Sequence, residues 1–119
     1  MKANILGTEY EVLYKNYNDE PYFEKYSCDG YCDSVTKQIV LCTANTHPYL
    51  CGETERYRRE AQKTTIRHEI IHAFLNESGL QDNSGVITNK GWARNEEMVD
   101  FFAIQFPKIQ KVFEKLNVI

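Results

Sequence analysis

The sequence predicts an α+β fold, in which a small, mostly antiparallel sheet from the first half packs on helices from the second half. Apolar and polar residues alternate early in the chain, whereas the second half carries apolar residues at three- and four-residue spacing. With 42% hydrophobic and 26% charged residues, the composition is that of a globular domain and excludes a disordered chain, a collagen and a coiled coil. A length of 119 residues suits one domain, so residues 1–119 are expected to form a single unit.

The first half contains three predicted strands. Tyrosine and valine alternate with other residues over about 8–16, which indicates a half-buried strand. Beyond two clusters of turn-forming residues, further strands are expected at about 30–33 and 37–42, and together they make a short hairpin. Residues 43–52 contain asparagine, proline and glycine and are expected to form a loop.

The second half is predicted to be helical. A long helix is expected over 53–76, because acidic residues occupy its first turns and apolar residues follow a helical period towards its end. Residues 81–92 are polar and are expected to form a loop. A second helix is predicted over about 95–105 and ends at Pro107, which favours a last short helix over 108–116.

The large apolar residues of the last third are expected to face the core, as on any amphipathic helix of a globular domain. They are Trp92, Phe101, Phe102, Ile104, Phe106, Ile109, Val112, Phe113 and Leu116.

Four cysteines lie within one stretch of 24 residues: Cys28, Cys32, Cys42 and Cys51. The N-terminus carries no recognisable export signal, so a cytoplasmic location and free thiols are the main expectation. Two alternatives stay open. A metal site would use the 28/32 pair, the only pair with the spacing typical of zinc ligands, and a disulfide would require an oxidising compartment.

Charge and hydropathy argue against two classes of partner. The net charge of −3 gives no general attraction to nucleic acid, and no apolar run approaches the roughly 20 residues that span a membrane. Four basic residues recur at helical spacing within the long helix: Arg56, Arg59, Lys63 and Arg67. Nucleic-acid contact is one interpretation of them, but a solvated face is favoured because the chain is acidic. The oligomeric state stays open.

The strongest chemical signal is the run His68-Glu69-Ile70-Ile71-His72 inside the long helix. Residues four apart share one helical face, so both imidazoles can point at one metal ion. Glu69, one position on from His68, can reach a metal-bound water as general base without ligating the metal. The pattern therefore predicts a zinc site that activates water for attack on a carbonyl.

A catalytic zinc ion needs a third protein ligand, and Glu96 is the preferred candidate. Asp100 lies four residues further on and shares its helical face, where it can hydrogen-bond a ligating imidazole. His47, in the loop before the long helix, is the weaker alternative as a ligand.

These residues resemble a known class of enzymes. His68-Glu69-x-x-His72 followed by Asn95-Glu96-x-x-x-Asp100 is similar to the gluzincin metallopeptidases, the thermolysin-like class, and the second run is also similar to ImmA/IrrE-type bacterial metallopeptidases. Small zinc-peptidase-like proteins of phages and prophages share these runs and the hairpin entry at 30–33. The resemblance covers most of residues 28–107. It implies a minimal zincin fold, Zn²⁺, a peptide or protein substrate and a bacterial host.

One departure from that class concerns the group that stabilises the oxyanion. Gluzincins commonly place a tyrosine or histidine after the glutamate ligand, and this chain has neither after His72. Arg94, Tyr31 or a backbone N–H would have to take that role. The alternative function is therefore a catalytically silent zinc-binding protein that acts by binding another protein.

Overall fold

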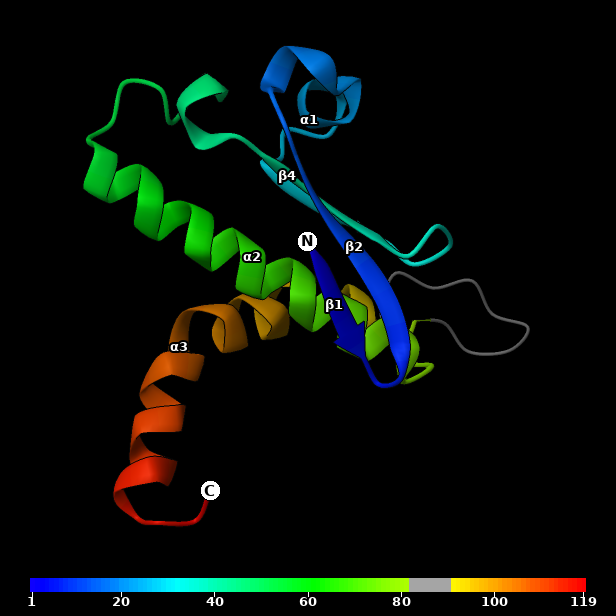
Figure 1. The fold of residues 1–119 in the computed structure, drawn as a ribbon, viewed down its shortest axis with the longest axis vertical. Helices are drawn as coiled ribbons and strands as arrows, with labels where there is room; N and C mark the ends of the chain where they lie inside the picture. The colour runs from blue at the N-terminus through cyan, green and yellow to red at the C-terminus, as the bar shows by residue number, and fades with distance from the viewer. Residues whose placement is uncertain (82–90) are drawn as a thin grey trace.

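The computed structural model describes residues 1–81 and 91–119, and within them the fold is α+β, as predicted (Figure 1). Its four strands are β1 (Lys2–Ile5), β2 (Thr8–Lys15), β3 (Gly30–Asp33) and β4 (Gln38–Cys42). Its α-helices are α1 (Pro21–Lys25), α2 (Glu55–Glu77) and α3 (Glu96–Lys115). Short 3-10 turns occur at η1 (Tyr17–Asp19), η2 (Ala44–Thr46) and η3 (Trp92–Arg94). The loop predicted over 81–92 lies mostly outside the described residues.

The sheet is mixed, with strand order β1-β2-β4-β3. β1 pairs antiparallel with β2, β2 pairs parallel with β4, and β3 pairs antiparallel with β4. The strands predicted at 8–16, 30–33 and 37–42 and the hairpin between the last two are confirmed. β1 was not predicted, because four residues are too few for a periodicity. It turns into β2 through Leu6 and Gly7, which both have the positive φ that a tight hairpin turn needs.

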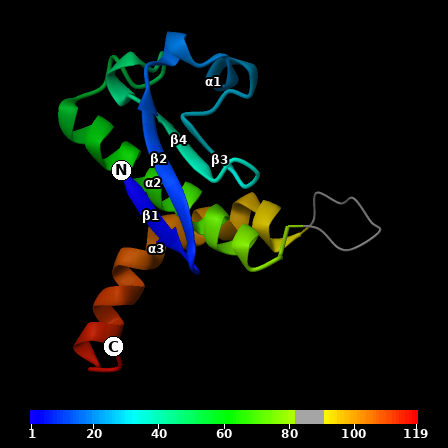
Figure 2. The ribbon, with the colours of Figure 1, turned by 45° about the vertical axis from the view of Figure 1, so that its right-hand side comes forward.

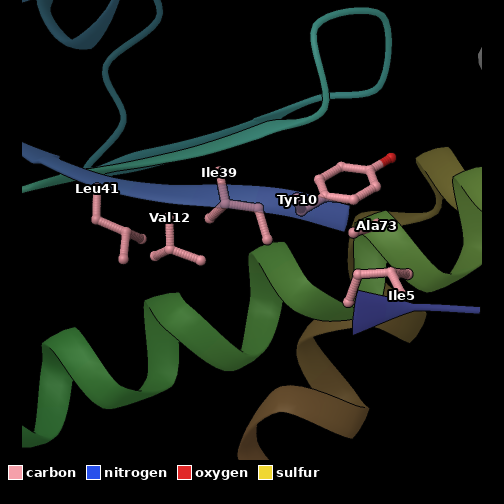
Figure 3. Packing of buried hydrophobic residues seen from close by; sticks show 6 residues of the cluster. All are labelled: Ile5, Tyr10, Val12, Ile39, Leu41 and Ala73. Carbon is pink, nitrogen blue, oxygen red and sulfur yellow. The ribbon is translucent and has the colours of Figure 1, made fainter. Parts of the chain in front are cut away.

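One face of the sheet packs against α2 and forms the larger core cluster: Ile5, Tyr10, Val12, Ile39, Leu41 and Ala73. Figure 3 shows these side chains filling the space between the strands and α2. Alternate positions of one strand share a face, so Tyr10 and Val12 of β2 point the same way as Ile39 and Leu41 of β4. Ala73 has no side chain beyond Cβ, and this lets the helix backbone approach the sheet closely.

The opposite face of β4 is covered by α1, the five-residue helix that the sequence analysis missed. Phe23 of α1 is fully buried against Val40 and Cys42, which alternate with the α2-facing residues of the same strand. Both faces of β4 are therefore covered, which explains why its apolar run is continuous rather than alternating.

The long predicted helix is confirmed as α2, which begins at Glu55 and ends at Glu77. Thr54 is its N-cap and accepts a hydrogen bond from the backbone N–H of Tyr57 at 3.1 Å. A 23-residue helix is about 35 Å long. Ile66, Ile70 and Ala73 of α2 pack against the sheet, and other residues along the same helix line a cleft.

The prediction of two helices separated at Pro107 is wrong, because α3 runs unbroken from Glu96 to Lys115 with the proline inside it. Proline has no N–H, so the carbonyl of Ala103, four residues earlier, loses its helical partner. The Nε–H of Arg67 on α2 donates to that carbonyl at 2.5 Å instead. A tertiary hydrogen bond thus replaces the missing helical one, and the helix continues.

The prediction that the apolar residues of the last third face the core is also wrong for most of them. Val99 and Ala103 are buried, but eight of the large side chains expose between 40% and 65% of their surface: Trp92, Phe101, Phe102, Ile104, Phe106, Val112, Phe113 and Leu116. The second half of α3 extends away from the sheet in both views (Figures 1 and 2). No helix in the described residues is both long and apolar enough to span a bilayer.

Glu77 ties the end of α2 to the sheet, and its titration should make stability depend on pH. Its carboxylate accepts hydrogen bonds from Thr8 and Tyr10, at 2.9 and 2.8 Å, and from Lys37. The Lys37 hydrogen bond contributes most to lowering the Glu77 pKa, from 4.5 to about 2. A depressed native pKa contributes stability that is complete above pH 4.5 and is lost as pH falls towards 2.

We therefore expect the midpoint of urea unfolding to fall as the pH is lowered from 4.5 towards 2. The midpoint should depend less steeply on pH in the Glu77→Gln variant. Glu53→Gln, in the exposed loop before α2, is the matched control and should keep the wild-type slope. Equal slopes for wild type and Glu77→Gln would show that Glu77 does not carry this dependence.

Candidate metal centre

The middle of α2 brings the motif residues to one point. The Nε2 atoms of His68 and His72 lie 3.0 Å apart, and the two rings meet edge to face. One nitrogen from each ring and one carboxylate oxygen of Glu69 all lie within 4.8 Å of one another, so this group could hold a metal ion. The helical spacing therefore does what the motif predicts: it points both imidazoles at the same place.

The outer ring nitrogens are held by a second set of contacts. His68 Nδ1 lies 2.8 Å from Asp100 Oδ1, as predicted, and His72 Nδ1 lies 2.6 Å from the carbonyl oxygen of Ala93. Both oxygens are acceptors, so in a neutral imidazole the proton sits on Nδ1. Each Nε2 then presents a lone pair to the other, an arrangement that is repulsive unless a cation or a proton lies between them.

Glu96, at the first turn of α3, faces both imidazoles with its carboxylate. Its Oε2 lies 3.0 Å from His68 Nε2, and its Oε1 lies 3.2 Å from His72 Nε2. Ligands about 2.0–2.1 Å from a tetrahedral zinc ion are separated by about 3.3 Å. The distances among the two imidazole nitrogens and the two carboxylate oxygens that face them are close to that value, so these three side chains could hold a metal ion of that size.

Glu69 is the buried acid of the site, with only 6% of its surface exposed. Burial, together with the smaller effect of the negative charges of Glu96 and Asp29, raises the pKa of Glu69 to about 8. Because a nearby positive charge lowers the pKa of a carboxyl group, a cation held by the imidazoles would favour the ionised form. The site thus couples the proton of Glu69 to the charge between the two histidines.

A cleft of about 1130 Å³ opens over this cluster. α2 forms one wall with His68, Glu69 and His72, and the strand β3 with the segment before it forms the other. Glu96 and Asp100 of α3 line the same cleft. β3 is an edge strand in the sheet order, so the wall opposite the histidines is the outer strand of the sheet.

Gly30 sets how closely β3 approaches α2. A Cβ at this position would lie 2.8 Å from Thr65 Cγ2, 3.2 Å from Leu41 Cδ2 and 3.3 Å from Glu69 Cγ. Thr65 cannot easily move its methyl group, because β-branched side chains have restricted rotamers in a helix. The absence of a side chain at Gly30 therefore decides the width of the cleft beside Glu69.

The variant Gly30→Ala should lose about 1–3 kcal/mol of unfolding free energy, the usual effect of overpacking. Urea denaturation measures this loss. Gly52→Ala is the control, since a Cβ there meets nothing within 4 Å. Equal stability of the two variants would mean that the close approach at Gly30 is unimportant.

The two residues proposed from sequence for the oxyanion lie in different settings. Arg94, in η3, lines the cleft. Tyr31 also lines it, but its hydroxyl donates to Glu20, and burial raises the pKa of Tyr31 above its ordinary value. The Tyr31 hydroxyl is therefore engaged on the α1 side of the cleft.

Three residues that position the site were missed by the sequence analysis. Ala93 contributes only its backbone carbonyl, which no sequence pattern marks. The sequence pattern marks Gly30 only as a turn residue and Arg67 only as part of a basic, solvated stripe, whereas in the structure Gly30 lies close to Thr65 and Arg67 binds the Ala103 carbonyl. A usable signal existed for Arg67: Pro107 within an apolar helical pattern implies an unpaired carbonyl at Ala103.

The cysteines and His47 do not join the cluster. All four cysteines are free thiols, and Cys28 and Cys32 pack against different core clusters of the sheet. Burial raises the pKa of Cys28 to about 11 and that of Cys32 to about 12, which favours neutral thiols. His47 is buried, with its ring against backbone atoms of Tyr49 and Cys28.

No known protein family, curated protein or solved structure matches this chain. The function of the protein is therefore inferred from the geometry of the cluster formed by His68, Glu69, His72 and Glu96.

Proposed function

We propose that the protein is a zinc-dependent peptidase of gluzincin type. The observation that carries the proposal is the convergence of His68 Nε2 and His72 Nε2, 3.0 Å apart, with the Glu96 carboxylate, which places one oxygen 3.0 Å from the first and its other oxygen 3.2 Å from the second. Both outer ring nitrogens are held in place. His68, His72 and Glu96 would hold the ion, and Asp100 and the Ala93 carbonyl would orient the two imidazoles. When bound, zinc would supply a Lewis acid that polarises a carbonyl and makes water more acidic.

Glu69 is the group that would move the proton. It lies beside the imidazole pair and is almost fully buried, so it can accept a proton from the attacking water and later donate it to the departing amine. Arg94, a cationic residue that lines the cleft, would be the candidate to stabilise negative charge on the carbonyl oxygen.

The substrate would bind along β3. An extended peptide can pair with the outer edge of a sheet, and β3 is an edge strand that lines the cleft opposite the histidines. Pairing there would carry a peptide bond past Glu69, and this favours a peptide over a compact small molecule.

The test combines metal analysis with a broad peptide library. Chain loaded with zinc and then desalted should retain one zinc ion, His72→Ala should retain much less, and peptide cleavage should disappear when a chelator is added. One zinc ion per chain without any cleavage would support the alternative, a catalytically silent zinc-binding protein. Equal zinc content in wild type and His72→Ala would overturn both.

A further inference from the structure

Within residues 1–81 and 91–119, the apolar side chains in the second half of α3 are not buried against the rest of the chain. In the described structure the buried residues of this helix are Val99 and Ala103, both before Pro107. From there the helix extends beyond the body of the molecule (Figures 1 and 2). Large exposed apolar surfaces on a small domain mark interaction sites.

Five apolar residues of this helix follow one another at steps of four, three, four and three: Phe102, Phe106, Ile109, Phe113 and Leu116. We call this row the α3 seam. Phe106, Phe113 and Leu116 expose 48%, 43% and 65% of their surface. Alternating steps of three and four give an average period of 3.5, which is the pattern of a helix that packs along another helix. The period therefore favours a helical partner over a flat surface.

The residues that flank the seam carry no charge. In a heptad with Phe106 and Phe113 at position a, the flanking e and g positions are Gln105, Gln110, Val112 and Asn117. The charged residues of this half, Lys108, Lys111, Glu114 and Lys115, fall at other positions. Two identical seams can thus face each other without repulsion between like charges. If the lysines lay beside the seam instead, their repulsion would oppose self-association.

The area is sufficient for a pair of chains. Five side chains of roughly 200 Å² each, about half exposed, would bury about 450 Å² per copy, or about 900 Å² in a symmetric dimer. The uncharged residues that flank the seam would raise the total accessible surface buried in the dimer to about 1,000 Å². This is about the smallest area expected for a specific interface. We infer that the α3 seam binds the α3 seam of a second copy of this chain, and this inference is independent of the proposed peptidase activity.

Sedimentation velocity and light scattering test this on the full chain at concentrations up to about 100 µM, which reveal micromolar association. The wild-type chain should dimerise reversibly with concentration. Phe113→Glu and Phe106→Glu should raise the dimer dissociation constant at least tenfold. Ile104→Glu is the matched control, because Ile104 is 52% exposed on the same helix but lies off the seam, and it should dimerise as wild type does.

Two results would overturn the inference. One is a wild-type chain that stays monomeric at the highest concentration, which would leave the seam to a different partner. The other is equal weakening by Ile104→Glu and Phe113→Glu, which would mean that general hydrophobicity, and not the seam, drives association. Far-UV circular dichroism of each variant checks that α3 is still folded.

Discussion

Replacing Glu69 with glutamine should lower the rate of peptide cleavage by roughly 10²–10⁴-fold, the usual contribution of a general acid–base. Glutamine has nearly the same shape but cannot accept the proton of the attacking water. The imidazoles and Glu96 are untouched, so the variant should keep one metal ion per chain. Cleavage rate and metal content, measured on the same preparation, check both parts.

The matched control for this experiment is Glu60→Gln. Glu60 lies on the same helix and lines the same cleft, but it is exposed and pairs with Lys63. The Glu60→Gln variant should cleave peptides at close to the wild-type rate. A Glu69→Gln variant that cleaves as fast as this control would exclude Glu69 from the chemistry, and one that loses its metal would indicate that Glu69 is a ligand.

Replacing Arg67 with methionine should weaken metal binding by about 10–100-fold, although Arg67 is not a ligand. Its guanidinium holds the Ala103 carbonyl at 2.5 Å, one turn beyond Asp100, and so fixes α3 against α2 beside the cluster. Without this contact the carbonyl is left without a donor and α3 can shift. Both Glu96 and Asp100 would then move relative to the histidines. A competition titration with a zinc chelator measures the effect.

Pro107 provides a decisive control for that prediction. In a Pro107→Ala background, residue 107 regains the N–H that normally bonds the Ala103 carbonyl, so losing Arg67 should then change metal affinity only a few-fold. Arg59→Met, which removes an exposed arginine paired with Glu55 on the same helix, should leave affinity unchanged. Strictly additive effects of Arg67→Met and Pro107→Ala would show that the two residues are not coupled through Ala103.

The candidate cluster was largely predictable because its main feature is local. Whether His68 and His72 share a face depends only on their being four apart in a helix, and the helix itself follows from nearby residues. The same holds for Glu96 and Asp100, whose shared face needs only the first turns of α3. Asp100 was therefore predicted to reach an imidazole, and it lies 2.8 Å from His68.

Two features of the molecule could not be derived in this way, because each depends on atoms far apart in the chain. The carbonyl of Ala93 holds His72, and backbone atoms look alike in every sequence. The continuity of α3 through Pro107 depends on a donor from α2, whereas the local rule for proline predicts a break.

The apolar period of α3 is the clearest case. The sequence by itself determined that one face of this helix is apolar, because the period depends only on the order of residues. The same period serves a helix that packs on its own core and one that packs on another chain. Only the tertiary structure showed that this face does not pack on the core of the described residues, since the sheet and α2 already fill each other's apolar faces and leave Phe106 and Phe113 exposed.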